Sequence, residues 1–205
     1  MDQAFFVTAF ATLFVVINPL GLVTFFMALT RGLGAPARRR IAARGSLIAA
    51  GLLAAFAFLG EALLNFIGIS LPAFRIAGGL LLFLTALQML FDRRARNEGE
   101  KAEDLGAHDP SVFPLATPLI AGPGAIASMI LLVTQAGAGL AGALAVTGLM
   151  LALVALTFAA LLLAPYLERL LGPTGSNVIT RLLGMLLAAL SVQFVLDGLK
   201  GAGLA

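Results

Sequence analysis

Apolar residues occur along this chain in long unbroken runs rather than at helical or strand intervals. Charged side chains are absent from residues 3–30 and 110–167. Further apolar stretches cover residues 41–64, 72–91 and 178–199. A membrane-spanning helix needs about 20 apolar residues, so the run at 110–167 holds two, separated by a glycine-containing turn at 135–139. The pattern predicts an all-α polytopic membrane protein with six transmembrane helices.

Proline and glycine interrupt two of these predicted spans. The first span contains Asn18-Pro19-Leu20-Gly21, and the fourth contains the segment TPLIAGPG at 117–124. Proline lacks a backbone N–H and clashes with the preceding turn, whereas glycine tolerates unwound backbone. We therefore expect helices one and four to be discontinuous.

The two halves of the chain show weak internal similarity. A shift of 104 residues aligns the two interrupted spans, and a shift of 106 aligns the third span with the sixth; the matched pairs include Pro19 with Pro123, Thr24 with Ser128, Arg75 with Arg181, and Gly78 with Gly184. Because each half has three spans, the copies must cross the bilayer in opposite directions. This predicts one membrane domain of two inverted three-helix repeats, 1–92 and 111–205, joined by a charged cytoplasmic linker at 93–110.

Composition and charge narrow the class of protein further. Apolar residues make up 60% of the chain and the mean hydropathy is +1.05, which excludes an ordinary soluble domain. The basic residues lie in short loops rather than on a nucleic-acid-binding face: five within 31–44, four within 93–101, and Arg169 with Arg181. These loops share one side in the six-span topology. The positive-inside rule makes that side cytoplasmic, so we expect a bacterial inner-membrane protein with both termini outside the cytoplasm, its arginines near anionic lipid.

Few residues could support catalysis. The chain has no cysteine and one histidine, and it lacks the phosphate-binding pattern of an ATPase. We therefore expect no enzyme activity, no catalytic residue, no metal site and no cofactor.

The interrupted spans predict a binding site. An unwound helix at membrane depth must be buried in protein or line a wet cavity, and each break exposes helix ends with free donors and acceptors. A small zwitterion suits such ends. Its carboxylate would accept hydrogen bonds from backbone N–H groups near Gly21 and at 122–124, and its ammonium would donate to carbonyls just before Pro19 or Pro123 and to the side-chain oxygens of Asn18 or Thr117. The candidate substrate-binding residues are Asn18, Pro19, Gly21, Thr24, Thr117, Gly122, Pro123, Gly124 and Ser128. Kinks that serve helix packing alone are the alternative reading.

Three segments resemble the MarC family of membrane proteins: Asn18–Gly21, the stretch FPLATPLIAGPGAIAS at 113–128, and the stretch ITRLLGMLLAALSVQFVLDGL at 179–199. That family is grouped with small neutral amino acid transporters of the SnatA type, which are associated with glycine and alanine. The resemblance implies six spans in two inverted halves, with the binding region at 18–21 and 117–124.

The leading hypothesis is a secondary transporter of small neutral amino acids such as glycine and alanine, working by alternating access. The sequence does not choose between a proton and a sodium ion as the coupling partner. A channel or exporter for other small solutes, and a membrane assembly protein without transport activity, are the alternatives.

Overall fold

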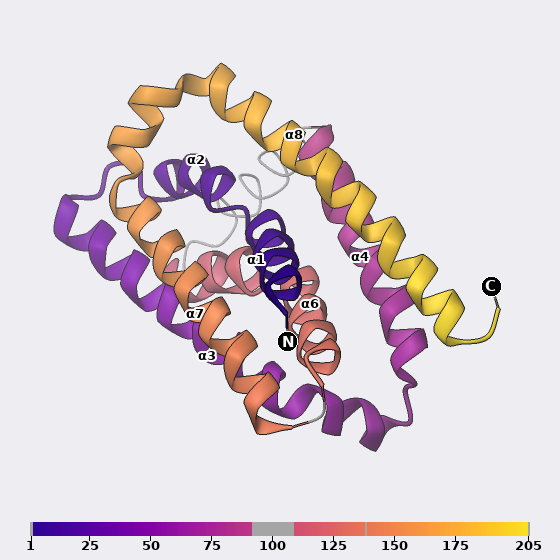
Figure 1. Ribbon diagram of the computed structural model, residues 1–205. Helices are drawn as coiled ribbons and strands as arrows, with labels where there is room; N and C mark the ends of the chain where they lie inside the picture. The colour runs from indigo at the N-terminus through magenta and orange to yellow at the C-terminus, as the bar shows by residue number, and fades with distance from the viewer. Residues whose placement is uncertain (1, 92–108, 138, 205) are drawn as a thin grey trace.

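The computed structural model describes residues 2–91, 109–137 and 139–204, and in this part of the chain it contains helices and no strand (Figure 1). The elements are α1 (Gln3–Ile17), α2 (Pro19–Leu29), α3 (Ala35–Ile67), α4 (Leu71–Leu90), η1 (Ser111–Ile120), α6 (Pro123–Gln135), α7 (Leu140–Leu162) and α8 (Ala164–Gly201). The predicted all-α class is confirmed, as is the turn between Gln135 and Leu140. The predicted linker lies outside the described residues except for Asp109 and Pro110.

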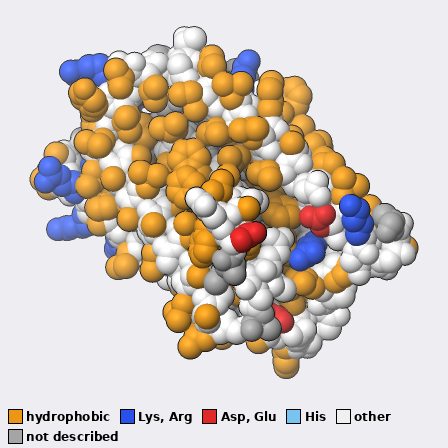
Figure 2. Space-filling model, in the orientation of Figure 1, with side chains coloured by type: hydrophobic (Ala, Val, Ile, Leu, Met, Phe, Trp, Pro, Cys, Tyr) orange, Lys and Arg blue, Asp and Glu red, His pale blue; other side chains and the backbone are white. Residues whose placement is uncertain are grey.

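Five helical segments are long and apolar enough to cross a membrane: Gln3–Leu29, Ala35–Ile67, Leu71–Leu90, Leu140–Leu162 and Thr174–Gly201. A sixth is obtained if η1 and α6, which are bent by 52° relative to each other, count as one span. Large apolar side chains cover the outer surface, including Phe66 at 89% exposure and Leu47 at 75% (Figure 2). A soluble protein rarely exposes so much contiguous apolar surface, so this surface faces lipid.

Two antiparallel helix pairs flank a central group. In Figure 1, α3 runs beside α7 in the opposite direction, and α4 runs beside α8 likewise; α1, η1 and α6 lie between the pairs. Three parts of the chain meet at one rim of the molecule: the α2–α3 connection, the end of α4 and the α7–α8 junction (Figure 1). Most of the basic residues of the sequence lie in or next to these parts.

Small residues allow α4 and α8 to pack closely. A Cβ added at Gly79 would lie 2.8 Å from the Ser191 carbonyl oxygen, and one at Gly198 would lie 2.9 Å from that of Pro72. Backbones can approach this closely only where side chains are missing, as is usual between membrane helices.

The first interruption is a single residue. Asn18 adopts left-handed backbone angles (φ 52°, ψ 66°), ends α1 and begins α2. Its side-chain Oδ1 accepts a hydrogen bond from the Gly21 N–H at 3.1 Å, and Pro19 fills the first helical position, where an N–H would have no partner. Asn18 therefore stops one helix and caps the next.

Helix α8 contains the apolar stretch predicted as a span at 178–199 and starts earlier than that stretch. It begins at Ala164 rather than near residue 178, and it contains a kink at Gly172, whose φ of 62° favours glycine. Residues 164–172 include the charged residues Glu168 and Arg169, so this first part of the helix does not stand out as an apolar run in the sequence.

An ion pair ties α3 to the start of η1. Arg44 Nη1 bonds Asp109 Oδ2, and Asp109 Oδ1 accepts hydrogen bonds from the Ser111 N–H at 3.0 Å and hydroxyl at 2.6 Å. The Ser111 hydroxyl and N–H, followed by Arg44, lower the pKa of Asp109 below its usual 3.8.

Acid is expected to remove the stabilising effect of this carboxylate. Because the folded-state pKa is depressed, the contribution is complete above the usual value of 3.8 and disappears as the pH falls through the lower folded value. Melting temperatures in detergent should be lower for Asp109→Asn than for wild type near neutrality, and the gap should close in acid. A gap of constant size, or the same closing gap in the exposed-carboxylate control Glu61→Gln, contradicts this assignment.

Candidate functional site

The second interruption is longer than the first and contains two prolines. Phe113 and Thr117, each followed by a proline, take extended backbone angles (φ −128° and −133°). This is the conformation that a following proline favours. The backbone turns back at Ala121, whose N–H donates to the Ala116 carbonyl at 2.8 Å, and α6 then starts at Pro123.

Gly122 allows the chain to fold tightly at this point. A Cβ on Gly122 would collide with the Pro118 carbonyl oxygen. Gly122 is also the N-cap of α6 and, being glycine, has no side chain with which to bond the first turn. The N–H groups of Gly124 and Ala125 accordingly have no hydrogen-bond acceptor among the described residues.

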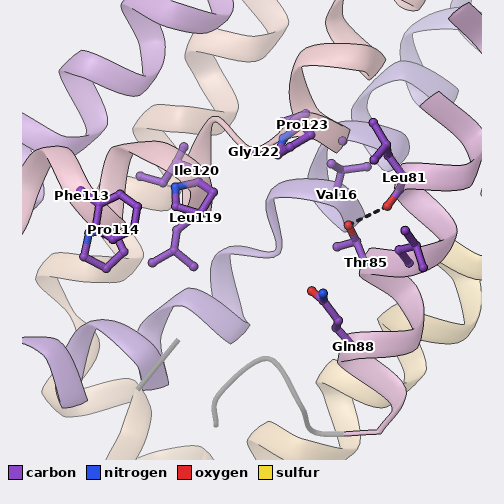
Figure 3. Close-up of a pocket in the computed structure, with 14 residues that line it drawn as sticks. Val16, Leu81, Thr85, Gln88, Phe113, Pro114, Leu119, Ile120, Gly122 and Pro123 are labelled. Atoms are coloured by element: carbon purple, nitrogen blue, oxygen red, sulfur yellow. Dashed lines mark hydrogen bonds between the residues drawn. The ribbon is translucent and has the colours of Figure 1, made fainter. Parts of the chain in front are cut away.

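A cavity of about 380 Å³ lies between this interruption and α4 (Figure 3). The end of α1 contributes to its wall. The lining residues are Val16, Leu81, Leu84, Thr85, Gln88, Phe113, Pro114, Pro118, Leu119, Ile120, Gly122, Pro123, Gly124 and Ala125. The positive end of α6, with its two free N–H groups, therefore opens on a cavity with mostly apolar walls.

Two polar side chains of α4 face the interruption across this cavity. Figure 3 shows Gln88 extending its amide from α4 toward the side of η1. Thr85 Oγ1 donates to the Leu81 carbonyl at 2.9 Å, so its lone pairs remain available as acceptors. No charged side chain lines the cavity in the part of the chain that the structure describes.

The structure places three of the nine predicted site residues at the cavity, namely Gly122, Pro123 and Gly124. Thr117 belongs to the same interruption, but it is exposed and does not line the cavity. Ser128 lies further along α6, is fully buried, and its hydroxyl has no partner among the described residues.

The other four predicted residues surround the first interruption, where three of them form hydrogen bonds with one another. Asn18 is buried and its Oδ1 accepts a hydrogen bond from the Gly21 N–H, while the Thr24 hydroxyl donates to the Gly21 carbonyl at 2.9 Å. Pro19 is buried too. The Gly21 N–H, expected to receive a carboxylate, is thus already bonded within the protein. Of this region only Val16, two residues before Asn18, reaches the cavity.

The face of α4 was missed as part of the predicted site. Leu81, Leu84, Thr85 and Gln88 have the i, i+3, i+4, i+7 spacing of one helical stripe. Thr85 and Gln88 are the polar members of this stripe, and the other polar side chain of α4, Arg75, lies near the start of the helix. That pairing was the available sequence signal for a wall of the site.

Comparison with known proteins identifies the family. Residues 3–203 match the family described as MarC family integral membrane protein. This chain belongs to the MarC family. Among its relatives, the UPF0056 membrane protein YhcE of Escherichia coli is 39% identical over 201 residues, which cover 94% of this chain and 90% of YhcE.

Further relatives come from other organisms. The UPF0056 membrane protein MJ1677 of Methanocaldococcus jannaschii is 36% identical, with 98% of this chain and 99% of the relative covered. YvbG of Bacillus subtilis is 36% identical, with 98% and 97% covered. The family resemblance of the sequence motifs is thereby confirmed. No solved structure matches the chain.

Proposed function

We propose that this MarC protein is a secondary transporter of small neutral amino acids, glycine and alanine in particular, and that the cavity beside Gly122 is its substrate site. The observation that carries the proposal is the pair of unbonded N–H groups, on Gly124 and Ala125, at the N-terminus of α6 within the cavity. A helix N-terminus with free donors binds a carboxylate without a charged side chain.

The remaining walls favour a small zwitterion. Opposite α6, the oxygens of Gln88 and Thr85 offer acceptors for an ammonium group. The absence of charge among the described lining residues disfavours solutes with a net charge. At about 380 Å³ the cavity holds glycine or alanine, and the apolar contacts of Val16 and Leu84 suit a short aliphatic side chain.

Two inverted repeats with discontinuous first and fourth spans are part of the proposal. The helix pairs support this arrangement. The third span of one half, α4, packs antiparallel to the third span of the other half, α8, and the two second spans, α3 and α7, pack antiparallel as well. Each half also has an interruption at the matched position, Asn18 or Gly122. In an alternating-access cycle the halves exchange environments, so the Asn18 region would line the site in the other state.

The proposed setting is the bacterial inner membrane, with the basic loops in the cytoplasm, both termini outside, and a proton or sodium gradient as the driving force. The α2–α3 connection and the α7–α8 junction, beside which the sequence carries basic residues, lie at one rim of the molecule (Figure 1), in keeping with the positive-inside rule. The same proposal gives this protein a function like that of SnatA-type transporters.

Counterflow in proteoliposomes tests the transport function. Vesicles loaded with unlabelled alanine should accumulate labelled alanine or glycine transiently, with saturation, whereas lysine and glutamate should not compete. Imposed proton and sodium gradients then identify the coupling ion. Flux that neither saturates nor shows counterflow indicates a channel. The absence of any flux above empty liposomes, for protein shown to be folded, contradicts transport and favours an assembly role.

A further inference from the structure

A second cavity, of about 290 Å³, lies at the rim where α2 ends, α3 begins and α7 passes into α8. Its lining divides into two parts. One part is basic, formed by Arg38 and Arg39, and the other is apolar; its residues are Phe26, Leu33, Ala35, Leu161, Leu162 and Pro165. No acidic residue lines it in the described parts of the chain. A basic wall facing an apolar one matches a molecule that is itself half anionic and half apolar.

Among the residues that the structure describes, the Arg38 guanidinium has no anionic partner. Its Nη1 contacts the Met27 sulfur at 3.9 Å, and its Nε is buried with no hydrogen-bond acceptor among the described residues. Burying a guanidinium donor without an acceptor is costly, so this position favours an added acceptor. The planar guanidinium fork matches a phosphate in particular.

The N-terminus of α3 adds to the positive electrostatic potential at this cavity. Gly34 caps this 33-residue helix without a side-chain hydrogen bond, and Ala35, in its first turn, lines the cavity. The partial positive charge of the helix N-terminus is therefore added to the two arginines. In Figure 2, basic side chains project from the left edge of the molecule beside a largely apolar surface.

The geometry points to a binding site for the phosphate headgroup of an anionic phospholipid. The phosphate lies on Arg38 and Arg39 at the N-terminus of α3, and the glycerol and upper acyl chain lie against Phe26, Leu161 and Leu162. A free phosphate ion could bind the two arginines equally well, but it would not contact the apolar wall. The apolar lining therefore favours a lipid. The rim position places the site at the level of lipid headgroups, where anionic lipids attract basic residues.

Lipid-dependent thermal stability tests the site. Purified protein in neutral detergent is melted with phosphatidylglycerol, with phosphatidylcholine, and with glycerol 3-phosphate or inorganic phosphate. Phosphatidylglycerol should raise the melting temperature in a saturable way, and the other three should not. Arg38→Gln/Arg39→Gln should weaken the affinity at least about tenfold, because two charge-assisted contacts are lost.

The matched control is Arg31→Gln/Arg40→Gln. It removes the same charge from exposed positions beside the cavity that do not line it, and it should retain the wild-type affinity. Equal loss in both double variants indicates general attraction to basic loops and overturns the proposal. An equal shift with glycerol 3-phosphate or inorganic phosphate shows a simple anion site and also overturns it. Should the first double variant not fold, Ala35→Phe keeps both arginines and fills the cavity; unchanged lipid affinity there refutes the site.

Discussion

Replacing Gly124 with leucine is expected to abolish alanine counterflow while the protein still inserts and folds. Gly124 lies in the first turn of α6 and lines the proposed substrate cavity. A Cβ there would lie 2.8 Å from Leu82 Cδ2, the movable end of a side chain, and 3.6 Å from Val16 Cγ1. The rest of the leucine would occupy the space beside the free N–H groups. Overpacking of this kind costs about 1–3 kcal/mol, which lowers stability without unfolding most proteins.

The measurement is initial counterflow rate at matched amounts of protein, with the melting temperature in detergent recorded alongside. Gly51→Leu is the control, because nothing lies within 4 Å of a Cβ at Gly51 and the residue is exposed on α3. Gly124→Ala should keep partial activity, since only the Leu82 methyl has to move. Wild-type rates in Gly124→Leu would exclude this cavity as the substrate site.

A variant from the opposite wall makes the test independent of the α6 backbone. Thr85→Phe enlarges a side chain of α4 that faces the same space. It should also abolish counterflow. Loss of transport from both walls, together with normal rates in Gly51→Leu, attributes the effect to the cavity rather than to helix geometry.

Much of this architecture follows from the chain's hydropathy and its prolines. Unbroken apolar runs locate the spans because a bilayer requires about 20 apolar residues per helix. Pro19 and Pro123 each become the first residue of a new helix, as expected where a missing N–H does no harm. The extended angles of Phe113 and Thr117 follow from the prolines after them; the break predicted at 117–124 included Thr117 and Pro118 but not Phe113 and Pro114.

The composition of the site was harder to foresee. A break was expected to leave backbone groups open to a ligand, and at Gly122 it does, because glycine provides no capping side chain. At Asn18 the amide folds back on Gly21 and satisfies the first turn locally. The difference between the two breaks is one side chain, Asn18 against Gly122, at positions that the internal alignment places together. Tertiary packing of α4 against α6 then decides which break faces a cavity.

That local satisfaction predicts a large effect on stability when Asn18 is changed. Asn18→Ala loses the cap to Gly21, worth about 1 kcal/mol, and places alanine at a φ of 52°, which costs a further 1–2 kcal/mol or so. The expected loss is about 2–3 kcal/mol in the free energy of unfolding. Asn18→Gly tolerates the left-handed angles and should lose less than about 1 kcal/mol. Denaturant unfolding in mixed micelles measures both.

Gly21→Ala separates the capping contact from the backbone strain. When residue 18 is asparagine, the Cβ of an alanine at position 21 would overlap the Asn18 amide nitrogen and lie 2.9 Å from Asn18 Cγ. The Asn18 amide must therefore move and lose its hydrogen bond with the N–H of residue 21. Gly21→Ala should therefore destabilise the protein when Asn18 is present. In the Asn18→Gly background the obstacle is gone, and alanine should stabilise α2 by up to about 1 kcal/mol through its higher helix propensity.

The sign of the Gly21→Ala effect thus depends on the residue at 18, and a double-mutant cycle measures the coupling. We expect a coupling energy of about 1 kcal/mol or more, because the two residues share one hydrogen bond and one volume. Additive effects would mean that Asn18 does not cap α2, and that the left-handed turn alone separates α1 from α2. The Asn18 amide would then be free to reach a ligand, and the two breaks would be chemically more alike than the hydrogen bond between Asn18 and Gly21 implies.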